Sequence, residues 1–244
     1  MVASDLPGVE ELRLLSAGFE GVSPAEVLRW AQQRFGVRVA IGTSFQLSGL
    51  VLLHQAATVG LSLECFTIDT DLLFPESVEH RLEIERFFKL KVDVLRPAAS
   101  PEEQARELGA ELWQRQPDTC CTLRKVVPLQ EKLKRLDAWI TGLRRDQGES
   151  RHGVQILESY LFDPLRDHYV LKINPLASWT RDDVWKYVQT HQIPYNRLLD
   201  HGYRSIGCRP CTRPAGEGGN ERAGRWTGFD KAECGLHTFM KAHV

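Results

Sequence analysis

The chain has 244 residues, of which 42% are hydrophobic and 26% are charged, and its formal net charge is −1. This composition is typical of a soluble globular protein, and the length suffices for one sizeable α/β domain. A charge near zero argues against broad, sequence-independent binding of nucleic acid. No apolar run approaches the roughly 20 residues of a membrane span, and residues 1–19 lack the pattern of a secretory signal. We therefore expect a cytoplasmic protein with neither a nucleic-acid nor a membrane partner.

Helices and strands are predicted to alternate along the first part of the chain. The segment Ser23-Pro24-Ala25-Glu26 predicts a helix start, because it offers an N-cap serine, an early proline and a glutamate at the third helical position. Strands are predicted at residues 37–41, 63–68, 92–95 and 138–142, and helices at residues 50–58, 75–90, 101–115 and 123–135. Such alternation is typical of βαβ units with a parallel sheet.

The pattern weakens after Gly153. Residues 180–183 predict one more helix start, and from about residue 201 the chain is expected to be loop-like. We expect a Rossmann-like α/β part at residues 1–200 and a loop-rich C-terminal segment at residues 201–244, which together form a single domain.

Three polar segments follow predicted strands, at residues 42–49, 69–74 and 143–151. Ligands of parallel sheets bind beyond the carboxyl ends of the strands, so these segments should rim one crevice. Residues 42–49 offer backbone N–H groups and hydroxyls to an oxyanion at a helix N-terminus. They lack the Gly-Lys-Ser/Thr of a Walker loop, so nothing here indicates an ATPase.

Arginines gather in the second half of the chain and suggest a pocket for anions. They are Arg144, Arg145, Arg151, Arg204, Arg209, Arg213, Arg222 and Arg225. Guanidinium groups suit sulfate and phosphate oxygens. The alternative is an ordinary solvated surface, since Glu217 and Glu221 dilute the charge of this region.

Four of the six cysteines form two pairs, Cys120-Cys121 and Cys208-x-x-Cys211. In a reducing cytoplasm such cysteines favour metal binding or redox chemistry over structural disulfides. Adjacent cysteines face a single tetrahedral zinc ion only with strain, whereas in a cubane iron–sulfur cluster they can bind different irons. The pattern therefore favours an iron–sulfur cluster, with zinc and redox disulfides as alternatives. Lys125 stands four residues after Cys121 and on a helix would project from the same face.

The other two cysteines differ in their surroundings. Cys65 lies inside an apolar strand and is expected to be a buried structural residue. Cys234 lies in a polar tail with arginines before it and has no partner at metal spacing. It is either a thiolate nucleophile whose pKa is lowered by cations, or an exposed bystander.

Four motifs together resemble the assimilatory adenylyl-sulfate (APS) reductases, in their cluster-containing bacterial form. The motifs are Cys120-Cys121-x-x-Arg124-Lys125-x-x-Pro128-Leu129, Gly207-Cys208-x-Pro210-Cys211-Thr212-Arg213-Pro214, Glu221-Arg222-x-Gly224-Arg225-Trp226 and Glu233-Cys234-Gly235-Leu236-His237. The resemblance extends from about residue 37 to residue 237. It implies an adenine-nucleotide α-hydrolase-like fold and makes Cys234, on a mobile tail, the catalytic nucleophile.

The resemblance also implies a substrate site and one [4Fe-4S] cluster. The implied cluster ligands are Cys120, Cys121, Cys208 and Cys211, and the implied nucleotide-loop residues are Thr43, Ser44, Phe45, Asp69, Thr70, Arg144 and Arg145. Residues implied to hold the phosphosulfate of APS are Ser44, Lys125, Arg151, Arg222 and Arg225. The sequence departs from the family pattern at Asp71, where glycine is frequent, and at Gly148, where serine is frequent.

The resemblance implies a two-step reaction. The Cys234 thiolate attacks the sulfur of APS, AMP departs, and an S-sulfocysteine remains on the tail. A thioredoxin thiolate then releases sulfite, and the tail must swing out for this step. The cluster is expected to act electrostatically through Lys125. His237 either assists the ionisation of Cys234 or is a plain helical residue, and the sequence leaves a homo-oligomer open.

Three other functions are alternatives to this one. A reductase of 3′-phospho-APS (PAPS), or of both nucleotides, is the nearest, although PAPS-specific enzymes usually lack the four cluster cysteines. A zinc-binding tRNA-thiolating enzyme of the same fold would need an S-G-G-x-D-S loop, which residues 43–49 do not supply. A non-catalytic zinc module that binds nucleic acid is disfavoured by the net charge and by the lack of an aromatic-basic platform.

Overall fold

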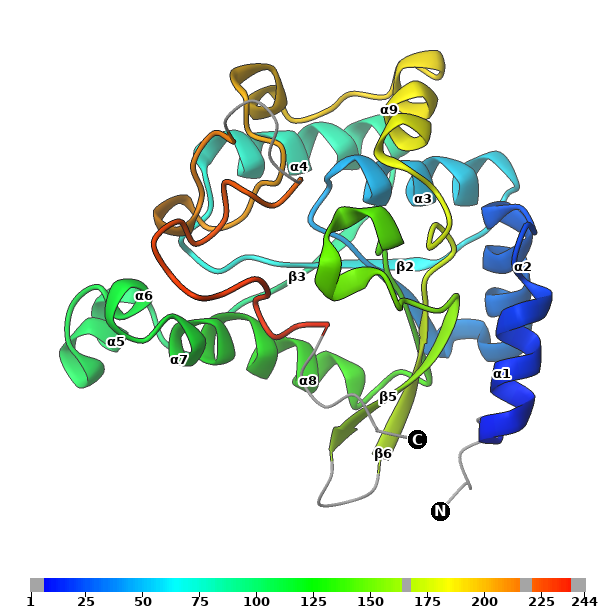
Figure 1. The fold of residues 1–244 in the computed structure, drawn as a ribbon, viewed down its shortest axis with the longest axis horizontal. Coiled ribbons are helices and arrows are strands. Elements are labelled where there is room, and N and C mark those ends of the chain that lie inside the picture. Colours follow the sequence, from blue (N-terminus) through cyan, green and yellow to red (C-terminus); the bar gives the residue numbers. More distant parts are fainter. Residues whose placement is uncertain (1–6, 164–167, 216–220, 238–244) are drawn as a thin grey trace.

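The computed structural model describes residues 7–163, 168–215 and 221–237, so residues 216–220, which include Glu217, and residues 238–244 of the predicted C-terminal segment lie outside it. Within these residues, six strands form one sheet in the order β3-β2-β1-β4-β6-β5 (Figure 1). The strands are β1 (Val39–Gly42), β2 (Glu64–Ile68), β3 (Val92–Leu95), β4 (Ala138–Ile140), β5 (Leu157–Asp163) and β6 (His168–Ile173). Every neighbouring pair is parallel except β5 with β6. The predicted α/β fold with a parallel sheet is confirmed.

The β5–β6 hairpin was not predicted from the sequence. The apolar sequence pattern of β6 is interrupted by Lys172. This residue is only 2% exposed and pairs with Glu158 of β5 at 3.0 Å. A buried lysine with a carboxylate partner is compatible with a sheet interior, but it breaks the apolar run that marks such a strand in the sequence.

The helices are α1 (Val9–Gly18), α2 (Pro24–Phe35), α3 (Leu47–Thr58), α4 (Pro75–Phe88), α5 (Pro101–Leu108), α6 (Leu112–Arg115), α7 (Pro117–Cys121), α8 (Val127–Leu133) and α9 (Arg181–Thr190). Helix α2 has the predicted capping box, in which the Ser23 side chain accepts from the Glu26 backbone. The helix predicted at 101–115 is divided into α5 and α6, with Glu111 in the left-handed conformation (φ 52°) between them. No helix in the described part of the chain is long and apolar enough to cross a membrane.

The two faces of the sheet are covered unequally. Helices α1, α2, α3, α4 and α9 contribute to the large core on one face, and α3, α4 and α9 lie together above the sheet in Figure 1. On the other face, the smaller core packs against Leu129 and Leu133 of α8, and Leu236 of the C-terminal tail adds to it. The tail and α8 therefore together cover the smaller core on this face of the sheet.

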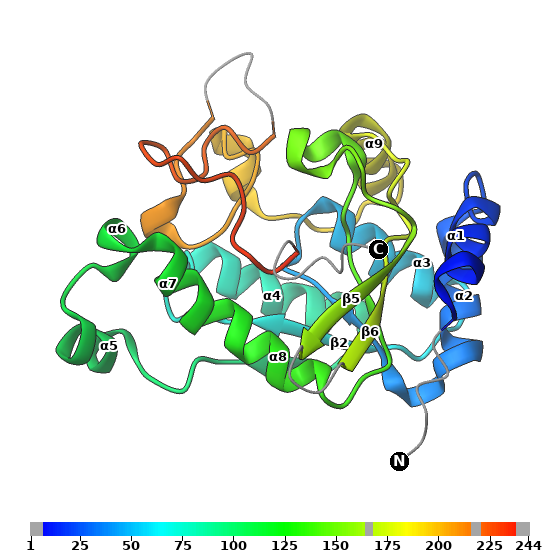
Figure 2. The same ribbon diagram turned by 60° about the horizontal axis from the view of Figure 1, so that its bottom comes forward.

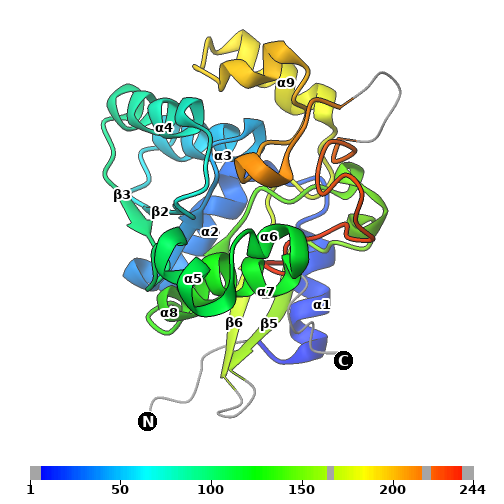
Figure 3. The ribbon, with the colours of Figure 1, turned by 90° about the vertical axis from the view of Figure 1, so that its left-hand side faces the viewer.

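Residues 221–237, which we call the C-terminal tail, lie against the body of the protein. In Figure 2 this segment, drawn in orange-red to red, passes above α6 and α7 and then turns toward the middle of the molecule. The Tyr160 hydroxyl of β5 donates to the Leu236 carbonyl at 3.3 Å. Figure 3 shows the same tail beside the segment 209–211 in orange, which contains Cys211 and follows directly on Cys208, the other member of the second cysteine pair.

Candidate active site

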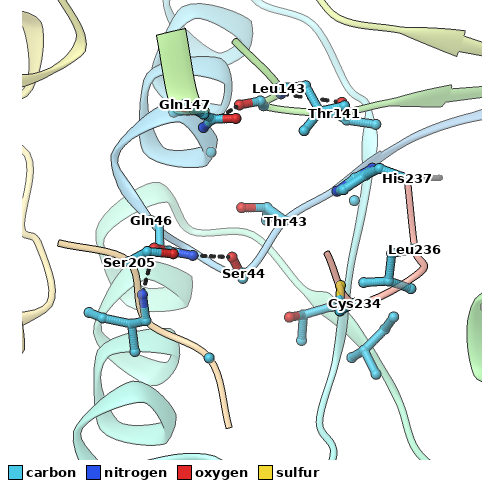
Figure 4. Close-up of a pocket in the computed structure, with 18 of the residues that line it drawn as sticks. Thr43, Ser44, Gln46, Thr141, Leu143, Gln147, Ser205, Cys234, Leu236 and His237 are labelled. Atoms are coloured by element: carbon cyan, nitrogen blue, oxygen red, sulfur yellow. Dashed lines mark hydrogen bonds between the residues drawn. The ribbon is translucent and has the colours of Figure 1, made fainter. Parts of the chain in front are cut away.

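A cavity of about 220 Å³ lies at the carboxyl ends of β1, β2 and β4. The three segments predicted to rim one crevice all line it, through Thr43, Ser44, Thr70, Leu73, Leu143, Arg144, Gln147 and Arg151. The opposite wall is formed by the tail residues Cys234, Leu236 and His237 (Figure 4). The prediction of a common crevice is therefore confirmed.

The segment after β1 is held in a tight turn that presents Thr43 and Ser44. The Thr43 hydroxyl accepts a hydrogen bond from the Phe45 backbone at 2.9 Å. The Gln46 amide donates to the Ser44 hydroxyl at 3.1 Å and accepts from the Ile206 backbone at 2.9 Å. Phe45 has a φ of 55°, is buried and does not line the cavity. Thr43 and Ser44 thus line the cavity, whereas Phe45 shapes the turn.

The segment after β2 brings Thr70, but not Asp69, to the cavity wall. The Thr70 hydroxyl lies 3.3 Å from the Cys208 sulfur. This contact links the segment after β2 to the second cysteine pair. Asp69 accepts from the Asp71 backbone at 3.0 Å and pairs with Arg96 at 3.2 Å. Asp71 has a φ of 54°, a conformation that glycine adopts freely and that aspartate tolerates better than most residues.

The loop after β4 separates its two arginines. Arg144 lines the cavity, and its three guanidinium nitrogens donate to Ser48, Asp146 and Glu221. Arg145 does not line the cavity: it donates to the Val154 carbonyl and pairs with Glu20. Arg144 and Arg145 therefore both make hydrogen bonds and ion pairs within the protein.

Gly148 of the same loop has φ 154° and ψ 166°. That backbone region is essentially restricted to glycine. A residue with a β-carbon, such as serine, would be strained at this position of the loop.

Three cations of the predicted anion pocket surround one aromatic ring. The buried Trp226 ring has the Arg225 guanidinium at 4.4 Å, the Arg222 guanidinium at 5.3 Å and the Lys125 ammonium at 6.0 Å from its centroid. Lys231 lies over the same ring at 5.6 Å. Attraction of each cation to the ring offsets part of their mutual repulsion. Lys125, Arg222 and Arg225 all line the cavity.

Cys234 is half-buried in the cavity wall. Burial raises the pKa of its thiol, whereas the Lys125 ammonium and the Leu236 backbone N–H lower it. Arg225 and Arg222 lower it further, so the pKa of Cys234 lies below its ordinary value. A thiolate at this position is the form that acts as a nucleophile.

His237 lies in a turn, so the expectation of a helical residue is wrong. Its ring stacks on Trp139 at 5.3 Å with an interplanar angle of 11°. Burial and the nearby cations Lys172, Arg151 and Arg222 hold its pKa well below the ordinary value, so the ring is neutral. Its contacts give it a role in seating the tail.

The four cysteines of the two pairs lie close together. Cys120, Cys121 and Cys208 are buried and Cys211 is half-buried. Burial and the three neighbouring thiols raise the pKa of Cys120 to about 11. The ammonium of Lys125 lies 3.9 Å from the Cys121 sulfur. Cys65, by contrast, is buried away from them in β2, where burial first and then Glu85 and Glu64 raise its pKa to about 12.

Two residues of the site were not predicted from the sequence. Trp139 lines the cavity, and Glu233 bonds to two of the cavity arginines. The position of Glu233 beside Cys234 was a usable signal. Trp139, however, lies inside a short apolar strand, where nothing distinguishes a cavity residue from a core residue.

Residues 38–214 match the family described as the phosphoadenosine phosphosulfate reductase domain. The chain belongs to this family. A relative named adenosine 5′-phosphosulfate reductase, from Salinibacter ruber, is 46% identical over 230 residues, which is 93% of this chain and 88% of the relative. A relative of the same name from Halalkalibacterium halodurans is 43% identical over 87% of this chain and 90% of its own. The predicted membership in a family of reductase enzymes is confirmed.

Solved structures agree on the fold. The phosphoadenylyl-sulfate (PAPS) reductase of Candida auris superposes with a TM-score of 0.75 at 30% identity, over 85% of this chain and 98% of that one. The FMN adenylyltransferase of Candida glabrata has a TM-score of 0.57 at 12% identity, over 94% of this chain and 79% of that one, and is alike in fold alone. The adenine-nucleotide α-hydrolase-like fold implied by the resemblance is confirmed.

Proposed function

We propose that this enzyme reduces adenylyl sulfate to sulfite and AMP, with Cys234 as nucleophile and thioredoxin as reductant. The observation that carries the proposal is the position of Cys234: its thiol lines the cavity opposite the Ser44 turn, and cations lower its pKa. The relatives named adenosine 5′-phosphosulfate reductase support the same substrate. The proposed setting is cytoplasmic sulfate assimilation and cysteine biosynthesis.

The first step is attack by the Cys234 thiolate on the sulfur of the phosphosulfate. A new S–S bond forms, the bond between sulfur and the bridging oxygen breaks, and AMP leaves with the electron pair. Lys125 and Arg225 line the cavity close enough to Cys234 to lower its pKa, and they would stabilise the charge on the leaving phosphate. Thr43, Ser44 and Thr70 offer hydroxyls to the nucleotide.

The second step is thiol exchange. One thioredoxin thiolate attacks Cys234 and expels sulfite, and the second thioredoxin thiol then displaces Cys234 as a thiolate and leaves oxidised thioredoxin. The two electrons that reduce the sulfur thus come from the thioredoxin dithiol. For this step the tail has to leave the cavity wall, so that a protein thiol can reach Cys234.

The residues Cys120, Cys121, Cys208 and Cys211 would hold one [4Fe-4S] cluster. Their thiols lie near enough to one another to raise the pKa of Cys120. Cys120 and Cys121 are adjacent in the chain, which suits a cubane, whose thiolates bind separate irons, better than a single zinc ion, whose ligands converge on one centre. When bound, the cluster would supply a fixed charge beside Lys125.

PAPS is the alternative substrate, supported by the likeness to the Candida auris enzyme. The four cysteines favour APS. Turnover on APS and on PAPS with reduced thioredoxin, measured side by side, separates an APS reductase from a dual enzyme or a PAPS reductase.

The proposal is tested by omitting the reductant. Enzyme incubated with APS alone should release about one AMP per chain and gain the mass of SO₃ on the peptide that contains Cys234. Reduced thioredoxin should then remove that mass and yield sulfite. Cys234→Ser should bind APS but form no adduct, while Cys65→Ser should behave as wild type. An adduct on another cysteine, or AMP release only with thioredoxin, would refute the mechanism.

A further inference from the structure

Glu233, the residue before Cys234, is held by two cavity arginines. Its carboxylate accepts from the Nε and Nη2 atoms of Arg151 at 2.7 and 2.9 Å, and from Nη2 of Arg222 at 3.1 Å. The Ser150 hydroxyl donates to it at 3.0 Å. The side chains of Arg151 and Glu233 are each only 9% exposed. A bidentate, largely buried ion pair of this kind is among the stronger polar contacts in proteins.

Each of the three guanidinium nitrogens of Arg151 donates one hydrogen bond to the protein. Its Nε and Nη2 atoms bond to Glu233, and its Nη1 atom bonds to the Gln147 side chain at 2.5 Å. Gln147 in turn accepts from the Arg144 backbone at 3.1 Å, so the group is fixed to the loop after β4. Arg151 therefore lines the cavity and at the same time links the loop after β4 to Glu233 of the tail.

The tail is also fixed on the other side of Cys234. Leu236 packs into the smaller core, and its carbonyl accepts from the Tyr160 hydroxyl. The His237 ring stacks on Trp139. Cys234 therefore sits between an ionic contact at residue 233 and an apolar contact at residues 236 and 237.

We propose that Glu233 is a positioning residue, whose ion pairs with Arg151 and Arg222 dock the tail so that Cys234 faces the substrate, and whose release frees the tail for the reductant. The proposal rests on the proposed role of Cys234 as nucleophile. It changes the role expected for Arg151, from a substrate ligand to the anchor of the tail.

The test divides the reaction into its two halves. Glu233→Gln keeps the shape of the side chain but removes its charge, and Asp230→Asn makes the same change at an exposed tail residue. Glu233→Gln should slow AMP release from APS, without reductant, by about 10- to 100-fold, because misplacing a reacting group costs rates of that order. Sulfite release from the preformed adduct by thioredoxin should be unchanged or faster. Asp230→Asn should match wild type in both halves.

Two further measurements test directly whether Glu233 docks the tail. Hydrogen exchange of the peptide covering residues 229–237, in enzyme without APS, should be faster in Glu233→Gln than in wild type and Asp230→Asn. In a double-mutant cycle, adding Arg151→Gln to Glu233→Gln should cost little more than Glu233→Gln alone, because both remove the same contact. Normal AMP release with normal tail exchange in Glu233→Gln would overturn the proposal. If wild type forms no adduct at Cys234, the proposed function fails, while the exchange data still decide whether Glu233 docks the tail.

Discussion

The ammonium of Lys125 lies 3.9 Å from the sulfur of Cys121 and, at the same time, lines the cavity that contains Cys234. The contact follows from spacing: the two residues are four positions apart on a helical segment that passes from α7 through a π-helical turn (Thr122–Val126) into α8. Lys125 is only 8% exposed, and the thiols around it hold its pKa above the ordinary value against the effect of burial. It is therefore a charged link between the cysteine group and the substrate cavity.

Replacing Lys125 by alanine should lower turnover on APS by about 10²- to 10³-fold, the usual cost of losing one preorganised charge at a reacting centre. The iron content should be unchanged, because the four cysteines remain. Lys134→Ala, which removes an exposed lysine at the end of α8, is the matched control and should keep full activity. Near-normal turnover of Lys125→Ala would show that this ammonium has no part in the reaction.

The sequence was sufficient for the parts of the site that depend on local rules. The carboxyl ends of parallel strands meet at one edge of a sheet, so the segments beginning at Thr43, Asp69 and Leu143 could be assigned to one crevice. The i, i+4 spacing of Cys121 and Lys125 likewise predicted their contact.

The contacts that the sequence could not predict depend on partners far apart in the chain. Arg145 and Arg144 are neighbours in sequence, yet Arg145 pairs with Glu20 while Arg144 donates to Ser48 and Glu221. Arg151 lines the cavity, as a substrate-binding residue should, but its pairing with Glu233, 82 residues away, could not be foreseen from either position. Ion pairs of this kind are decided by tertiary structure, and residue type alone does not reveal them.

The reactivity of Cys234 should depend on pH in the direction that its lowered pKa requires. Because only the thiolate reacts, the rate of alkylation should rise with pH and level off above the pKa of Cys234, with a midpoint below that of a free cysteine, about 8.5. Lys125→Ala should move this midpoint upward. Cys65 is the internal control: burial raises its pKa to about 12, so it should stay unmodified near neutral pH. A midpoint for Cys234 at or above that of a free thiol would contradict the assignment.

The metal content should follow the two cysteine pairs. Protein purified without oxygen should be brown and carry about four irons and four sulfides per chain, the composition of a cubane cluster. Serine at Cys120, Cys121, Cys208 or Cys211 should remove the colour, whereas Cys65→Ser should retain it. Iron and zinc analysis of the five variants measures this directly, and stoichiometric zinc in a colourless, active enzyme would exclude the cluster.

The role of the Arg225 guanidinium can be tested by substituting Gly207, which lies against it. A β-carbon built on Gly207 would lie 2.2 Å from Nη2 and 2.4 Å from Cζ of Arg225, so Gly207→Ala should push the guanidinium off the Trp226 ring. The flexible arginine can move, so the fold should survive. Its contact with the substrate anion should be weakened, and a hydrogen bond to a charged group contributes about 1.5–3 kcal/mol. We therefore expect kcat/KM for APS to fall by about 10- to 100-fold.

The control for this variant is Gly153→Ala, because a β-carbon at Gly153 meets no atom within 4 Å. It should have wild-type kinetics. Iron content has to be measured on Gly207→Ala as well, since Gly207 precedes Cys208, and it should be unchanged. The pH profile of Cys234 alkylation adds a second readout: displacing Arg225 removes one of the cations that lower the pKa of Cys234, so the midpoint should shift upward. Unchanged kcat/KM together with an unchanged midpoint would mean that Arg225 acts on neither the substrate nor the nucleophile.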